Sequence, residues 1–192
     1  MKLTKITRAA FLAAACALFA SSATPARAET SPAPYAVDTL RSSLEISGHD
    51  SILGAHVLTF DRWSAKIDGG TLPARLVFDI DLASIRCNEP MVKSIVANHM
   101  LEIAKYPHAT FVATLSPTNT PGVITIDGSA TIHGRTNPLH LSGQLRQEGS
   151  GYRFEASIDI SRKAYDLTYA PAEAVLDDKF VVTVSAVAMP EP

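Results

Sequence analysis

The chain has 192 residues, of which 46% are hydrophobic and 19% charged, and this is enough for one domain with its own core. Its formal net charge is −2, and it becomes −6 without residues 1–28, which carry four basic and no acidic side chains. A negative surface repels nucleic acid and anionic membranes, so we expect neither as a partner.

Residues 1–28 are predicted to be a cleaved secretory signal peptide. Three basic side chains come first, at Lys2, Lys5 and Arg8. Residues 9–20 are an unbroken apolar run, and Ala26-Arg27-Ala28 matches an A-x-A cleavage site. Twelve apolar residues are too few to span a bilayer, which argues against an uncleaved anchor. A lipidated Cys16 is the other alternative, but the leucine of a lipobox is missing. We expect cleavage after Ala28 and a periplasmic or secreted protein.

Cleavage removes Cys16 and leaves Cys87 alone, so no disulfide within the chain is expected. A free cysteine packs as a small hydrophobic side chain, which favours burial of Cys87. Pairing between two chains is the alternative, and a monomer and a homodimer are both compatible with the sequence.

Residues 29–34 form a short linker, and the predicted domain covers residues 35–190. Residues 35–38 and then 44–48 have the alternation of a strand. The apolar run over 56–67 is longer than an average strand, and its apolar phase slips near Asp61-Arg62. This slip predicts a β-bulge or a sharp bend. Asp68-Gly69-Gly70 is a turn, and the next strand is expected to run from Leu76 to Ser84-Ile85-Arg86.

One helix is predicted over residues 89–105. Asn88 is its expected N-cap, and Glu89 with Pro90 suits the first helical turn. The helix should end at Lys105-Tyr106-Pro107, because proline cannot continue a helix. Its methionines are expected either to pack in the core or to line the mouth of a ligand cavity.

The second half of the chain predicts an antiparallel meander. A strand over 110–115 is followed by strict alternation in 124–132, with Ile124, Ile126, Ala130 and Ile132 on one face. A five-residue link, 134–138, leads into the strand that starts at Leu139. Alternation continues in 152–160 and 180–186, with a hairpin turn at 149–151. The fold class is therefore all-β, with seven or eight antiparallel strands and one main α-helix.

Two short motifs in the middle of the chain resemble those of a known family. They are KYPHATF at residues 105–111 and the hairpin TIHGRTNPLHL at residues 131–141. Together they resemble the YceI-like lipid-binding family, and the resemblance extends from about Tyr35 to Ala188. It implies an extended, lipocalin-like antiparallel β-barrel that holds a polyisoprenoid or a similar amphiphile. In a third family motif, S-R-x-D-F-G, Ser161, Arg162 and Tyr165 fit, whereas Ala164 and Asp166 depart from it.

An eight-stranded barrel is either filled by its own side chains or holds one small ligand. The residues alone leave this choice open, and the family resemblance favours a cavity. Apolar side chains from different strands should converge there, and we expect the lining to include Phe60, Trp63, Phe78, Ile80, Phe111, Ile126 and Phe154. Such a cavity suits an aliphatic chain, so the expected ligand is an amphiphilic lipid and no other cofactor is expected.

The motifs of common enzymes are missing, since the sequence has no G-x-S-x-G, H-E-x-x-H or C-x-x-C. His133 and His140 flank the predicted hairpin link, but their apolar neighbours should point inward, so we expect both histidines to face solvent. With no third ligand evident, we expect no metal site and no enzyme. Two functions remain: a periplasmic carrier or store of a polyisoprenoid, or a ligand-free barrel that acts as a structural or interaction module. The second could attach to an envelope membrane protein through residues 40–53.

Overall fold

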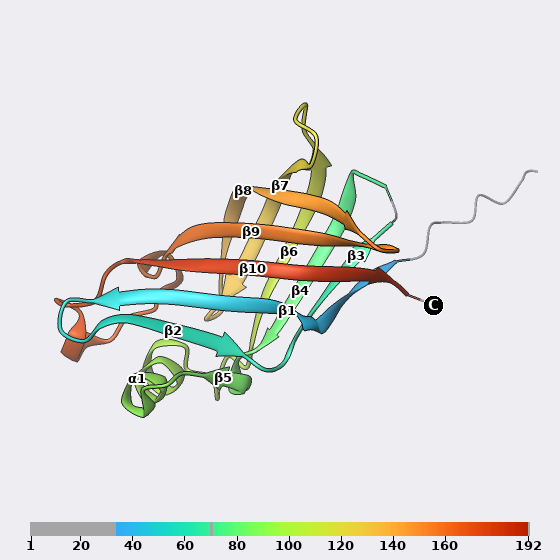
Figure 1. The fold of residues 1–192 in the computed structure, drawn as a ribbon. Helices are drawn as coiled ribbons and strands as arrows, with labels where there is room; N and C mark the ends of the chain where they lie inside the picture. The colour runs from blue at the N-terminus through green and yellow to red at the C-terminus, as the bar shows by residue number, and fades with distance from the viewer. Residues whose placement is uncertain (1–33, 70, 192) are drawn as a thin grey trace, which may run out of the picture. The chain divides into compact units, whose positions relative to one another are not determined.

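The computed structural model describes residues 34–69 and 71–191 (Figure 1). The predicted signal peptide and all of the linker except Pro34 lie outside the described residues. The strands are β1 (Tyr35–Asp50), β2 (Gly54–Phe60), β3 (Trp63–Asp68), β4 (Ala74–Asp81), β5 (Ile85–Arg86), β6 (His108–Pro117), β7 (Val123–Ile132), β8 (Arg135–Glu148), β9 (Gly151–Ser161) and β10 (Lys179–Pro190). The helical segments are η1 (Leu82–Ser84), α1 (Pro90–Ile95), η2 (Val96–Met100), η3 (Lys163–Tyr165) and η4 (Ala170–Ala172).

Eight strands close into an antiparallel barrel in the order β1, β3, β4, β6, β7, β8, β9, β10. The last strand pairs back onto the first, from Tyr35 opposite Pro190 to Ser47 opposite Val181 (Figure 1). Closure of this kind leaves none of these strands as a free edge. β3 pairs with the first residues of β1, and β2 pairs with its second half. The short β5 pairs with β2. The predicted antiparallel barrel with one main helix is confirmed.

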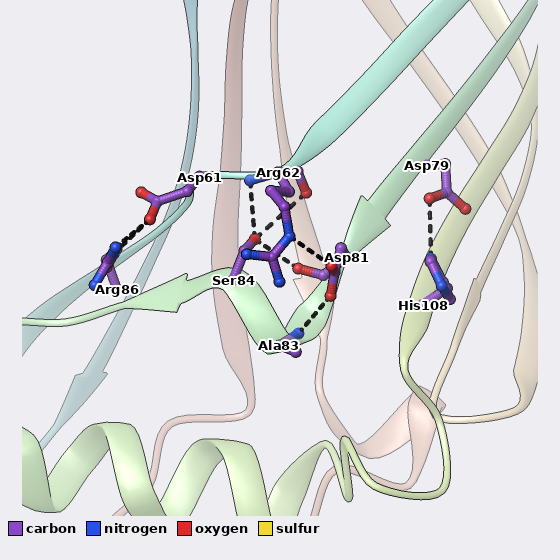
Figure 2. A network of polar contacts seen from close by, with 8 residues as sticks. All are labelled: Asp61, Arg62, Asp79, Asp81, Ala83, Ser84, Arg86 and His108. Carbon is purple, nitrogen blue, oxygen red and sulfur yellow. Dashed lines mark hydrogen bonds and ion pairs between the residues drawn. The ribbon is translucent and has the colours of Figure 1, made fainter.

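The predicted bend at Asp61-Arg62 is confirmed, because the two residues separate β2 from β3. Their backbone N–H groups donate to the carbonyl oxygen of Ser84, at 3.3 Å, and to its Oγ, at 3.0 Å, rather than to a neighbouring strand. The Arg62 Nε donates to Asp81 Oδ2 at 2.8 Å, and Asp81 Oδ1 accepts the N–H of Ala83 at 2.9 Å (Figure 2). The same bonds end β4 at Asp81, so the strand predicted to reach residues 84–86 is shorter and is followed by η1.

The predicted helix is present but shorter than expected. Glu89, not Asn88, is the N-cap, and its side chain makes no capping hydrogen bond. The helix widens into the π-helical η2 and ends at Met100. Glu102 then adopts a left-handed backbone conformation, with φ of 45°, which interrupts the helix. The expected end at Lys105 is wrong because this turn, and not Pro107, stops the helix.

The connection between β7 and β8 is a two-residue turn, so the predicted five-residue link is wrong. Ile132 pairs with Arg135, and the turn residues His133 and Gly134 have φ of 52° and 70°. Two positive φ values match the type I′ turns that suit tight hairpins. A Cβ atom on residue 134 would lie 2.7 Å from the Tyr106 ring, which explains glycine there. Residues 135–138 belong to β8, where Pro138 lies opposite Ser129.

Apolar side chains on the inward faces of the strands build one core, and the alternation predicted for 124–132 is confirmed. Ile124, Ile126 and Ala130 of β7 are buried, together with Leu76 of β4 and Leu115 of β6. Within residues 34–69 and 71–191, no helix is long and apolar enough to cross a membrane.

Candidate ligand cavity

The barrel interior is only partly filled, and a cavity of about 480 Å³ remains. This volume falls within the range of typical small-molecule sites. Strands from all sides of the barrel contribute to its wall, and α1 and η2 cover part of its mouth. The lining is almost wholly apolar. Such a surface favours an aliphatic ligand, because the free energy falls when apolar surface of the ligand and of the wall leaves water.

Six of the seven side chains predicted to line a cavity do line it. They are Phe60, Phe78, Ile80, Phe111, Ile126 and Phe154. Trp63 does not; its ring stacks on the ring of Phe78, with 5.0 Å between centroids and 13° between planes. Trp63 therefore supports the wall without forming it. Contact between these side chains and a ligand stays a prediction.

The side chains that line the cavity differ in how deeply they are buried. Ile126 on β7 is only 1% exposed, and Phe78 on β4 is also buried. By contrast, Leu141 on β8, Phe154 and Ala156 on β9 point inward and are only half-buried. Ile80 on β4 and Phe111 on β6 are half-buried as well, and both line the cavity. The sequence left open the choice between a filled barrel and a hollow one, and the structure shows a hollow one.

Two turns and the helix frame the mouth of the cavity. Ile52 and Leu53 come from the β1–β2 turn, Leu176 from the segment before β10, and Met91 and Met100 from the helix. Backbone bonds join the first two, since Ser51 N–H donates to Val175 O at 3.0 Å and Asp177 N–H donates to His49 O at 3.1 Å. Both methionines thus line the cavity mouth, and Met100 also packs against the core, so both expected roles occur.

The polar groups at the mouth are mostly paired with one another. Asp50 Oδ1 accepts the N–H groups of Ile52 and Leu53 at 2.8 and 2.6 Å, and Oδ2 lies 2.7 Å from His56 Nε2. The Leu53 N–H above all, with His56 and Ile52, keeps the pKa of the Asp50 carboxyl below its usual value, although burial opposes this. His56 Nδ1 is buried 3.8 Å from Glu89 Oε2, without a hydrogen-bond partner among the described residues.

Arg162 lies at the edge of the cavity, but its donors are occupied. It is 3% exposed, and its two terminal nitrogens donate to the Glu173 carboxylate at 2.9 and 2.8 Å. Its Nε donates to the carbonyl oxygen of Asp177 at 3.0 Å, and Nη1 also donates to that of Leu167 at 2.9 Å. The hydrogen bond from Arg162 lowers the pKa of Glu173. Arg162 therefore fixes the segment 163–178 beside the mouth and offers no free charge to a ligand.

Comparison with known proteins identifies the family. A model of the YceI-like domain matches residues 35–188. The chain belongs to the YceI-like family. The UPF0312 protein YE1254 of Yersinia enterocolitica is 31% identical over 101 residues, which cover 50% of this chain and 52% of that protein. A UPF0312 protein of Yersinia pestis, strain Pestoides F, is 32% identical over 101 residues with the same coverage. The match thus spans about half the length of these curated relatives.

Solved structures share the YceI-like fold. BcnA of Burkholderia cenocepacia superposes with a TM-score of 0.72 at 19% identity, covering 80% of this chain and 99% of that one. A polyisoprenoid binding domain from Saccharophagus degradans, implicated in plant cell wall breakdown, gives 0.70 at 14% identity, covering 82% and 98%. At these identities the likeness establishes the fold.

The three motifs that resemble the YceI-like family are joined by contacts among their aromatic and polar residues. Tyr106 of the KYP motif packs edge-on against His133 of the hairpin motif, with 4.6 Å between ring centroids. His133 Nδ1 lies 3.3 Å from the carbonyl oxygen of Tyr165 in the third motif. Asp166, where the family motif has glycine, adopts a left-handed φ of 60°, a conformation that aspartate tolerates better than most residues. Other residues of the motifs, among them Phe111, Leu139 and Arg162, line the cavity.

Two sequence-based expectations about polar residues need correction. The His133 side chain is only 11% exposed and is hydrogen-bonded, so its predicted solvent-facing position is wrong, whereas His140 is exposed as expected.

Cys87 is half-buried rather than buried, and its Sγ donates to Glu89 Oε2 at 3.2 Å. Burial raises the pKa of the Cys87 thiol. In the described part of the chain, no three His, Cys, Asp or Glu side chains are placed to hold a metal ion.

Proposed function

We propose that this protein binds a polyisoprenoid or a similar amphiphilic lipid in the barrel cavity, and carries or stores it in the periplasm or outside the cell. The observation that supports this most is the apolar cavity of about 480 Å³, whose lining includes side chains of the β1–β2 turn and of α1. The Saccharophagus domain of the same fold is described as polyisoprenoid binding. The composition of residues 1–28 supports export.

The hydrophobic effect alone can hold such a ligand. Each methylene group that leaves water contributes about 0.8 kcal/mol, so ten of them contribute about 8 kcal/mol before the cost of ordering the chain. The polar side chains at the mouth are occupied in pairs, such as Asp50 with His56 and Arg162 with Glu173. We propose binding rather than catalysis, because a catalytic site needs a nucleophile or an acid and base poised toward the substrate.

Native mass spectrometry of the protein purified from its own cell envelope tests the proposal. A carrier retains a mass of lipid size, which organic extraction removes and chromatography identifies. Protein that carries no extra mass, and that does not take up an added prenol such as farnesol, would contradict the proposal. That result would favour the ligand-free structural or interaction module.

A further inference from the structure

Three large apolar side chains at the cavity mouth face solvent. Ile52 and Leu53 in the β1–β2 turn are 71% and 55% exposed, and Met91 at the start of α1 is 62% exposed. We call these three side chains the mouth tip. All three also line the cavity. Apolar side chains of the cavity wall therefore extend onto the outer surface of the protein.

The turn that carries Ile52 and Leu53 is held outward by hydrogen bonds. Asp50 Oδ1 accepts the backbone N–H of each, at 2.8 and 2.6 Å, and the Ser51 N–H donates to Val175 O at 3.0 Å. Moving the backbone of this turn would break these bonds. The exposure is thus a property of a well-defined turn.

We propose that the mouth tip inserts into the surface of an uncharged or zwitterionic lipid bilayer, where the cavity loads or releases its ligand. This inference rests on the proposed function. A lipid that crosses between a bilayer and the cavity would pass along the mouth tip and stay in contact with apolar atoms throughout. The continuity of the mouth tip with the cavity provides that path.

The charges around the mouth fit a neutral lipid surface. Residues 51–55 carry no charge. Asp177 lies 3.2 Å from His49, and Lys179 lies 3.6 Å from Asp159. Lys93 on α1 is a single basic residue with no ion pair among the described residues, whereas anionic lipids bind clusters of unpaired basic residues.

The size of the mouth tip favours a lipid surface over a protein partner. A stable protein interface takes roughly 20–30 residues from each side, and three side chains fall far short of that number. Shallow insertion requires much less, because apolar side chains need to enter only about 5–10 Å into the boundary of head groups and acyl chains.

Flotation with phosphatidylcholine vesicles tests the inference. We expect the full chain to float with the vesicles and the double variant Ile52→Ser/Leu53→Ser to bind them at least tenfold more weakly. The matched control is Leu40→Ser on β1, where the leucine is 97% exposed but does not line the cavity. This control should bind vesicles as the unchanged protein does. Binding should also stay constant between about 0.1 and 1 M NaCl, since screening does not weaken apolar insertion.

Three outcomes would overturn the inference. The double variant could bind vesicles as well as the unchanged protein, or the unchanged protein could bind only anionic vesicles and lose them in salt. In the third outcome, sedimentation shows that the unchanged protein is a dimer and that the double variant, but not the control, is a monomer. This result would mean that the mouth tip binds a second copy of the chain. A tryptophan placed by Ile52→Trp gives an independent signal: its emission should shift to the blue with vesicles, and that of Leu40→Trp should not.

Failure of this inference can be told apart from failure of the proposed function. Farnesol titration of the unchanged protein without vesicles reports only on the cavity. Farnesol binding without vesicle binding would leave the proposed function in place and contradict docking of the mouth tip. Vesicle binding without farnesol binding would support docking of the mouth tip and contradict the proposed function.

Discussion

His133 Nε2 lies 2.6 Å from Glu102 Oε2, while His133 Nδ1 lies 3.3 Å from the carbonyl oxygen of Tyr165. A carboxylate and a carbonyl oxygen both accept hydrogen bonds and donate none. Through these two contacts His133 connects the turn after the helix, the β7–β8 hairpin and the segment after β9.

We expect His133→Asn to lower the free energy of unfolding by about 1–3 kcal/mol, because it leaves the Tyr165 carbonyl without its donor. Asparagine tolerates the left-handed backbone conformation of residue 133, so the loss reports side-chain contacts. Urea unfolding measures the change. The control, His140→Asn, removes an exposed ion pair with Asp127 and should change the free energy by less than about 0.5 kcal/mol. Equal effects of the two variants would contradict this role of His133.

Asp50 should contribute to the acid sensitivity of the fold. Its pKa is lower in the folded protein than in the unfolded chain, where it is about 3.9. The stabilisation is therefore complete above the unfolded pKa and is lost as the pH falls through the folded pKa. We expect Asp50→Asn to cost about 1–2 kcal/mol near pH 7, and the difference from the unchanged protein to shrink below about pH 4.

Urea unfolding between about pH 3 and pH 7 measures this difference. The exposed Asp68, whose Oδ2 lies 3.5 Å from Arg75 Nη1, provides the control through Asp68→Asn. Its pH profile should follow that of the unchanged protein. A difference between Asp50→Asn and the unchanged protein that stays constant down to pH 3 would show that the Asp50 charge does not stabilise the fold.

Much of the barrel could be predicted because the alternation of apolar residues is local to each strand. The inward faces of β4, β7, β9 and β10 follow that period of two, and all four strands were located. The end of the helix depends instead on distant residues. Residues 101–105 have spacing compatible with a helix, but the left-handed turn at Glu102 is fixed by its contact with His133, 31 positions along the chain. No local pattern encodes such a contact.

Arg162 should be more important for stability than an exposed arginine. We expect Arg162→Lys to cost about 1–3 kcal/mol, because one ammonium group cannot reach the carboxylate and the carbonyl oxygens that the guanidinium now binds. Arg135→Lys is the control: Arg135 pairs with Asp166 at 3.2 Å on the surface, and its loss should cost less than about 0.5 kcal/mol.

Limited proteolysis provides a second measurement for Arg162. The segment 163–178, which Arg162 holds through Glu173 and the Leu167 carbonyl oxygen, should be cut faster in Arg162→Lys and at an unchanged rate in Arg135→Lys. An unchanged cleavage rate in both variants would show that other contacts hold this segment.

Half-buried and fully buried positions of the cavity wall should respond differently to added volume. Ala156→Trp places a large ring at a half-buried position, so we expect a small change in the melting temperature of ligand-free protein and loss of bound lipid. Ile126→Trp places the same ring at a position that is only 1% exposed and should cost about 1–3 kcal/mol. Calorimetry with native mass spectrometry measures both. Equal destabilisation by the two variants would indicate a solid core and contradict the carrier function.

The candidate site was predicted in part for the same physical reason as the fold. Alternation placed Phe60, Phe111 and Phe154 on inward faces, and closure of the barrel brings inward faces together. The polar mouth could not be predicted, because Asp50 meets His56 across a hairpin and Arg162 meets Glu173 across an irregular segment. The prediction that His133 faces solvent was wrong because the alternation of inward and outward side chains along a strand does not continue into a turn.

The pairing of β1 with β10 has a consequence for how the protein is made. Ser42 Oγ accepts the N–H of Val187 at 2.9 Å, although the two residues are 145 positions apart. While the ribosome is still adding residues, β1 has no β10 to pair with, and contacts between such distant segments form slowly. The barrel therefore cannot close until β10 has been synthesised, and until then the edge of β1 that β10 covers in the folded protein has no partner strand.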